Sequence, residues 1–409
     1  MAVSPIKRLM VSIGIPIVVS MMLQAVYNIV DSVYLSNMRE AGEEALTALG
    51  LAFPVQLFMV AVAIGTGVGT NALLSKSLGQ GNREKASRTA RNAIFMGCAI
   101  SIVFLLFGIF GVPAYSNSQN AGGNISETVI QMTIDYLRIC CVSFGIVFFS
   151  IYEKMLQATG RSLYSTIAQI TGAVVNIVLD PIFIYGWFGA PEMGVRGAAW
   201  ATVIGQIVSA VLVFVFHMKL DVEVDKTLSY LKPQKDILKD IYSIGLPAII
   251  SQALLTVMTY GLNLILGQID TVGENVVTVY GLYCKIQQLI IFAAVGMRDA
   301  ITPIVSFNYG MKSQKRIKEG IRYGMLYTLI LMVLGLIIIE LLADPLTSFF
   351  SLSGITHTIC VDCMRIVSLR FIFAGLSIAF QGVFQAIECG IESLLISLGR
   401  QVVFILPVA

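Results

Sequence analysis

Charged side chains are scarce in this sequence. Asp, Glu, Lys and Arg together make up 12% of the 409 residues, whereas soluble globular proteins carry about 25%. Four stretches contain no charged residue at all, namely 45–74, 92–126, 197–218 and 241–269. Each is longer than the roughly 20 apolar residues that cross a hydrocarbon core as a helix. The scarcity of charge therefore excludes an ordinary soluble domain and indicates a membrane protein with many spans.

Other absences narrow the class further. The short alternating segments of a membrane β-barrel are missing, and in lipid a long apolar run has to be helical. No phosphate-binding loop, HExxH motif or nucleophile triad is present, so we expect neither an enzyme nor an ATP-driven pump. Cys360 and Cys363 form a single CxxC without a second pair, so no metal cofactor is expected. The positive charge lies in short loops, which gives no reason to expect a nucleic-acid partner.

Eleven membrane-spanning helices are predicted from the uncharged runs. The first follows Lys7 and Arg8 and has no cleavage site, so it is a span and not a signal peptide. Counted from the N-terminus, one set of alternate loops holds 19 of the 27 basic residues, and the opposite loops hold only Arg39 and Arg196. The positive-inside rule then places the N-terminus in the cytoplasm. The spans are centred near Met22, Met59, Phe104, Val147, Ile170, Ser209, Thr256, Ile290, Val333, Leu376 and Phe404.

The chain also aligns with itself at a shift of 231 residues. Pro16 matches Pro247, and several glycines of the first half, such as Gly14, Gly65 and Gly79, recur in register in the second. Six spans per repeat is an even number, so the repeats are parallel, a recurrent transporter plan. We therefore expect an all-α integral membrane protein with an N-terminal lobe (1–218), a cytoplasmic linker (219–239) and a C-terminal lobe (240–409). The second repeat is incomplete, which predicts a C-terminally truncated chain.

Two acidic residues lie inside predicted spans of the first repeat. Charges within the membrane are costly, so Asp31 and Asp180 indicate function. Asn176 precedes Asp180 by one helical turn and shares its helix face, and Pro181 is expected to disturb the helix there. Burial disfavours the ionised form of a carboxyl group, so such a group can load and release a proton near neutral pH. Alternatively, Asn and Thr oxygens nearby would let it hold Na⁺.

The remaining charged residues in spans are weaker candidates. Asp31 corresponds to Leu262 in the second repeat, so ion coupling is expected in the first lobe only. Lys285 is expected mid-membrane, where it could meet an anion or a carboxylate. Arg298 and Asp299 are expected to pair internally, and Arg370 is expected to reach towards an interface.

Several segments together resemble signatures of the multidrug and toxic compound extrusion (MATE) family. The resemblance covers the whole chain, and its specificity comes from the combination of motifs. The lack of acidic residues in the second lobe resembles the bacterial branch related to the DNA-damage-inducible DinF proteins. The matching segments are 24–32, 63–75, 157–161, 176–184, 194–202 and 303–310.

The resemblance implies a V-shaped carrier of two lobes and twelve helices that exchanges an organic compound for H⁺ or Na⁺. Carried over by motif, the cation site would use Asp31, Asn176, Asp180 and Thr202, with Na⁺ held by the first three. The further residues expected to line the cavity are Tyr27, Asn28, Gln252 and Lys285.

The predicted function is therefore cation-coupled export of organic, cationic or amphipathic compounds. We expect a monomer in the bacterial cytoplasmic membrane, surrounded by lipid and without a cofactor. The main alternative is a lipid-linked oligosaccharide flippase of the same superfamily. A flippase would favour a strongly basic cavity, for which the sequence offers only Lys285 and Arg298. A membrane scaffold without transport activity is a further alternative.

Overall fold

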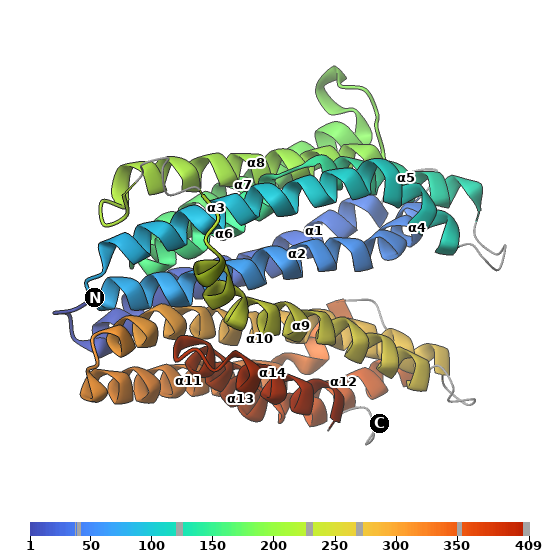
Figure 1. Cartoon of the computed structure of the whole chain (residues 1–409). Coiled ribbons are helices and arrows are strands. Elements are labelled where there is room, and N and C mark those ends of the chain that lie inside the picture. The colour runs from blue at the N-terminus through green and yellow to red at the C-terminus, as the bar shows by residue number, and fades with distance from the viewer. Residues whose placement is uncertain are drawn as a thin grey trace.

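The computed structural model describes residues 1–36, 38, 42–119, 126–225, 232–266, 273–349 and 354–403, and every regular element among them is a helix. In Figure 1 the N-terminal half (blue to green) lies beside the C-terminal half (yellow to red). The elements of the N-terminal half are α1 (Ile6–Ser36), α2 (Gly42–Gly79), α3 (Arg83–Leu106), a π-helical turn (Phe107–Gly111), α4 (Val112–Gln119), α5 (Glu127–Val142), α6 (Gly145–Ala158), α7 (Ser162–Tyr185), a 3-10 turn (Trp187–Gly189) and α8 (Val195–Leu220).

The C-terminal half also combines long and short helices. Its elements are α9 (Lys235–Leu266), α10 (Gly273–Gly310), α11 (Gln314–Phe349), α12 (Gly354–Ser368), α13 (Phe371–Ala386), α14 (Gly390–Leu398) and a final π-helical turn (Gly399–Val403). Across the described ranges, eight helices are long and apolar enough to cross a membrane, or up to ten if each of two bent pairs counts as one span. The prediction of an all-helical, multi-pass membrane protein is confirmed. The centre of the eleventh predicted span, Phe404, lies outside the described residues.

Two of the predicted spans are not single straight helices. The span near Val147 is α5 and α6, which meet at an angle of 42°, and the span near Leu376 is α12 and α13, which meet at 47°. At the first break Ser143 adopts an extended conformation and its Oγ accepts a hydrogen bond from the backbone N–H of Gly145 (3.1 Å). The side chain thus replaces a lost helical partner. Uncharged composition alone does not reveal such a bend.

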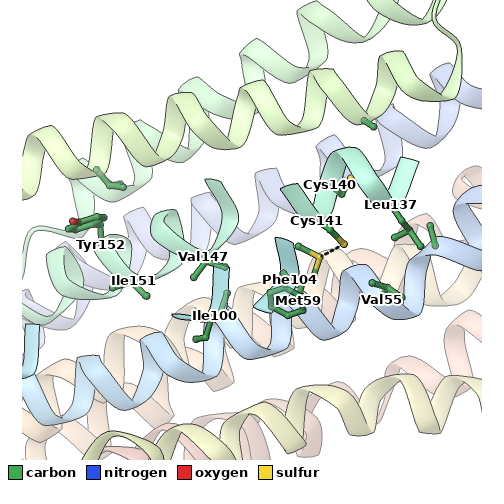
Figure 2. Close-up of a cluster of buried hydrophobic side chains, with 14 of the residues drawn as sticks. Val55, Met59, Ile100, Phe104, Leu137, Cys140, Cys141, Val147, Ile151 and Tyr152 are labelled. Atoms are coloured by element: carbon green, nitrogen blue, oxygen red, sulfur yellow. Dashed lines mark hydrogen bonds between the residues drawn. The ribbon is translucent and has the colours of Figure 1, made fainter. Parts of the chain in front are cut away.

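The interior of the N-terminal half is a continuous apolar cluster that joins α2, α3, α5 and α6. Figure 2 shows its centre, where Met59 of α2 lies against Phe104 and Cys141. The Cys141 and Met59 sulfur atoms are 3.7 Å apart. Burial of such side chains stabilises the packing of the helices on one another.

Helix α1 takes part in the core of the other half. Ile6, Met10, Ile13 and Ile17 are almost completely buried in the cluster that α10, α11 and α13 form. The later part of α1 carries Asp31. A single continuous helix therefore links the core of the C-terminal half to the predicted cation site.

The two halves approach each other through glycines. A β-carbon at Gly79 would lie 2.0 Å from the carbonyl oxygen of Phe307, and one at Gly310 would lie 2.2 Å from the carbonyl oxygen of Lys76. Gly79 and Gly310 are 231 residues apart, and so are Lys76 and Phe307. The same contact, of a glycine with a backbone carbonyl oxygen, is therefore made twice, once from each half. These positions require glycine because any side chain would force the backbones apart.

Candidate cation site

Helix α7 places two polar side chains one above the other. Asn176 and Asp180 are one turn apart and almost fully buried, at 3% and 0% exposure. The Asn176 amide nitrogen donates to an oxygen of Asp180 (3.4 Å) and lies 3.5 Å from the hydroxyl oxygen of Thr202 on α8. A β-carbon at Gly205 of α8 would lie 3.1 Å from the β-carbon of Asn176, so glycine lets the two helices meet here.

The expected disturbance of the helix at Pro181 is not found. Helix α7 continues through this residue to Tyr185. Because proline has no N–H, the carbonyl of Ile177 still lacks its usual helical donor. Proline costs a hydrogen bond here, but the packing of α7 against α8 and α1 keeps the helix intact.

Asp31 lies on α1, which packs against α7. Its carboxyl group interacts electrostatically with Asp180, and Tyr27, one turn earlier, interacts with both acids. The structure therefore brings together Asp31, Asn176, Asp180, Thr202 and Tyr27. Their role in ion coupling stays a prediction.

Three oxygen atoms of the site are buried without a hydrogen-bond donor. They are Oδ1 of Asp31, Oδ2 of Asp180 and Oδ1 of Asn176. Buried acceptors nearly always have a partner, so three together indicate a missing one. Protons or a hard cation such as Na⁺ would supply it. Across the part of the chain that the structure describes, no three His, Cys, Asp or Glu side chains gather as a metal site. Two carboxyl groups with Asn and Thr oxygens would suffice for Na⁺, so the candidate site does not need a third such side chain.

Two neighbours of the site were missed in the sequence. Tyr136 of α5 is buried, and its hydroxyl oxygen accepts a hydrogen bond from Gln56 of α2 (2.9 Å). Tyr136 and Cys140 both interact electrostatically with Asp31. An uncharged Tyr in an apolar helix gives no signal of its own in the sequence.

A further residue missed in the sequence is Lys154, one of the 19 basic residues that the sequence assigns to one set of loops. It lies within α6, only 2% exposed, and its Nζ is 2.5 Å from Oδ2 of Asp299 on α10. The predicted internal pair of Arg298 with Asp299 is confirmed, at 2.8 Å. The guanidinium of Arg370 donates a hydrogen bond to Gln287 of α10, and its position relative to a membrane interface stays a prediction.

The other residues expected to line the cavity are Gln252, Asn28 and Lys285. Gln252 is half-buried on α9, which packs against α2 and α14. The side chains of Asn28 and Lys285 lie outside the described residues.

Comparison with known proteins gives a family. The sequence profile of the family described as MatE matches residues 16–182 and 247–409. The two matches begin at Pro16 and Pro247, the same offset at which the chain aligns with itself. Among curated relatives, the multidrug export protein MepA of Staphylococcus aureus (strain MRSA252) is 24% identical over 404 residues, which is 98% of this chain and 86% of the relative.

Solved structures agree in fold. A multidrug resistance MATE family transporter of the MOP superfamily, in an outward-facing conformation, superposes with a TM-score of 0.90 at 27% identity. The match covers 98% of this chain and 87% of that one. A MOP superfamily transporter from Pyrococcus furiosus Vc1 matches with a TM-score of 0.85, also at 27% identity, over 98% of this chain and 87% of that one.

Proposed function

The chain belongs to the MATE family, and we propose that it exports organic compounds in exchange for H⁺ or Na⁺ bound between Asp31 and Asp180. Its relatives include proteins named for multidrug export, and they do not favour the oligosaccharide flippase. We place the protein in a bacterial cytoplasmic membrane as a monomer, with its N-terminus in the cytoplasm. The substrates are organic compounds of cationic or amphipathic character.

The observation that carries this proposal is the set of three buried oxygens without donors. Two carboxyl groups that face each other out of water repel when both are ionised. A proton or Na⁺ between them removes the repulsion and draws α1 towards α7. Loss of the cation reverses this. The site thus has two states that differ in the position of α1.

Helix α1 gives this local change a long-range effect. Its first part lies in the core of the C-terminal half, and its later part carries Asp31. Movement of α1 at the acids therefore changes the contact between the halves. We propose that the halves, 1–218 and 240–409, rock about their glycine contacts and expose a substrate to alternate sides, with 219–239 as the linker.

The energy of one entering cation is sufficient for useful export. One charge that moves through about 100 mV supplies roughly 2.3 kcal/mol. Because about 1.4 kcal/mol corresponds to a factor of ten, the membrane potential alone supports a gradient of an uncharged substrate on the order of 50-fold. A monovalent cationic substrate exchanged one for one moves no net charge, so its export draws on the concentration gradient of the entering ion.

Transport into proteoliposomes under separately imposed pH and Na⁺ gradients tests the proposal. A fluorescent cationic or amphipathic dye serves as the substrate. We expect one of the two gradients to drive dye movement in the unaltered chain, and Asp31→Asn to reduce that movement to the level of empty vesicles. Undiminished movement in the variant would refute the coupling role, and dye movement that needs neither gradient would refute cation exchange.

A further inference from the structure

A buried ion pair crosses between the two halves. The Nζ of Lys154 on α6 and Oδ2 of Asp299 on α10 are 2.5 Å apart, with side chains 2% and 4% exposed. Given the proposed function, on which this inference rests, we propose that Lys154 and Asp299 are positioning residues for alternating access. Their pair holds the halves together in the present conformation, and each member turns to a partner in its own half when the halves separate.

Each member of the pair already has that second partner. Lys154 donates a hydrogen bond to Oε1 of Gln157 on its own helix (3.0 Å) and interacts electrostatically with Glu153. Asp299 accepts two hydrogen bonds from the guanidinium of Arg298, at 2.9 and 2.8 Å. A buried charge that loses its only partner is strongly unfavourable. Here separation leaves neither charge alone, so the pair can open and close repeatedly.

The two cations are fixed to different halves. The aliphatic stem of Lys154 lies against Gly67 of α2, where a β-carbon would be 2.8 Å from its Cγ. The stem of Arg298 lies against Gly382 of α13, again with 2.8 Å between a β-carbon and its Cγ. Lys154 therefore moves with the N-terminal half and Arg298 with the C-terminal half. Asp299 therefore contacts both Lys154 and Arg298 when the halves are together, and keeps only Arg298 when they are apart.

Two more ion pairs join the halves near helix ends on the side of the basic loops. Lys76 pairs with Glu388 (2.5 Å), and Lys85 pairs with Asp240 (3.0 Å). In both, as in the buried pair, the lysine belongs to the N-terminal half and the acid to the C-terminal half. Their side chains are 20–44% exposed, and exposed pairs contribute little. The buried pair is therefore the one whose loss should shift the equilibrium between conformations.

Distances between two spin labels in the full chain, measured by double electron–electron resonance, test this role. The spin labels are placed at two exposed positions on the basic-loop side, Val222 and Lys315. Val222 lies in the linker segment that Arg161 of the N-terminal half holds through ion pairs with Asp221 and Glu223, and Lys315 lies in the C-terminal half. After the native cysteines have been replaced, the distance between the labels reports the separation of the halves. We expect Asp299→Asn to raise the ratio of separated to closed molecules on the order of tenfold. The matched control is Asp240→Asn, which removes the acid of the exposed pair and should change the ratio less than about twofold. Equal effects of both variants would overturn the inference.

A double-mutant cycle separates positioning from simple stabilisation. Lys154→Gln should shift the ratio in the same direction, and the double variant Lys154→Gln/Asp299→Asn should shift it no further than the larger single change. Lys154→Arg keeps the charge and should restore most of the closed population. Additive shifts, or a lower Tm with an unchanged ratio, would contradict the role. If the ratio shifts as expected in a chain that moves no substrate, the proposed function fails and the positioning role stands.

Discussion

The two halves build similar helix contacts but bury different chemistry in them. Between α2 and α6 the cation is Lys154 on α6 and the glycine is Gly67 on α2. Between α10 and α13 the cation is Arg298 on α10 and the glycine is Gly382 on α13. Gly67 and Arg298 are 231 residues apart, and Lys154 and Gly382 each lie four residues before the end of their helix. At this helix contact each half therefore packs one long cationic side chain against a glycine, but the cation and the glycine have exchanged helices between the two halves.

The acids are not shared in this way. The N-terminal half holds Asp31 and Asp180 with unpartnered oxygens, and Leu262 stands at the position that corresponds to Asp31. The buried acid of the second half, Asp299, already accepts hydrogen bonds from two cations. We propose from this difference that the acids of the first half bind the exchanged ion, whereas Asp299 of the second half takes part in the contact between the halves.

The largest effect that would test this division is loss of an acid from the first half. We expect Asp180→Asn to reduce gradient-driven transport to background, because the remaining carboxyl group no longer has a facing charge for a cation to bridge. Its control is Asp135→Asn in the same half, where a partly exposed pair with Arg196 (2.6 Å) is lost. The control should keep transport within about twofold. Equal losses in both variants, measured as dye flux at matched protein amounts, would remove the special role of Asp180.

The glycine contact between the halves should be the next most sensitive feature. Gly79→Ala places a β-carbon 2.0 Å from a backbone carbonyl oxygen, and overpacking of this kind costs about 1–3 kcal/mol. Gly50→Ala on the same helix is the control, because a β-carbon there meets nothing within 4 Å. Thermal unfolding in detergent should show a clearly lower Tm for the first variant only. A similar Tm for both would mean that the halves do not need this close approach.

A smaller effect of opposite sign is expected at Arg298. Arg298→Gln removes the partner that Asp299 keeps when the halves separate, so the closed state should become more populated. We expect the ratio of separated to closed molecules to fall a few-fold, in contrast to its rise for Asp299→Asn. Spin-label distances measure this ratio. A rise for both variants would show that Arg298 and Asp299 act only as a structural pair.

The smallest effect is expected at the exposed pair of Lys76 and Glu388. Lys76→Gln should change the free energy of unfolding by less than about 1 kcal/mol and leave transport unaltered. Loss of transport here, in a stably folded variant, would move the decisive contact from the buried pair to the surface.

Much of the fold could be predicted because each membrane-spanning helix requires a long segment without charged residues. Long uncharged runs located the spans, and a lone acid within such a run, like Asp31 or Asp180, stands out against its surroundings. Spacing within one helix placed Asn176 beside Asp180 correctly. The bends near Val147 and Leu376 could not be predicted, because a single polar residue such as Ser143 or Arg370 in an apolar stretch does not indicate a break in the helix.

Contacts between distant helices were the other limit. Lys154 and Asp299 are 145 residues apart, and no periodicity within either helix predicts that they meet. Lys154 lies only four residues before the end of α6, and a position so near a helix end cannot be told from a loop position by charge alone. Tyr136 was overlooked for a similar reason, since its place beside Asp31 depends on how α5 packs on its neighbours.

Direct measurement of cation binding to the purified chain tests the central claim most directly. Sodium binding by calorimetry, and proton uptake on a step in pH recorded with an indicator dye, can be compared between the unaltered chain and Asp31→Asn/Asp180→Asn. The account predicts Na⁺ binding or an extra proton taken up per molecule in the unaltered chain, and neither in the variant. Identical binding and uptake by both chains would contradict it.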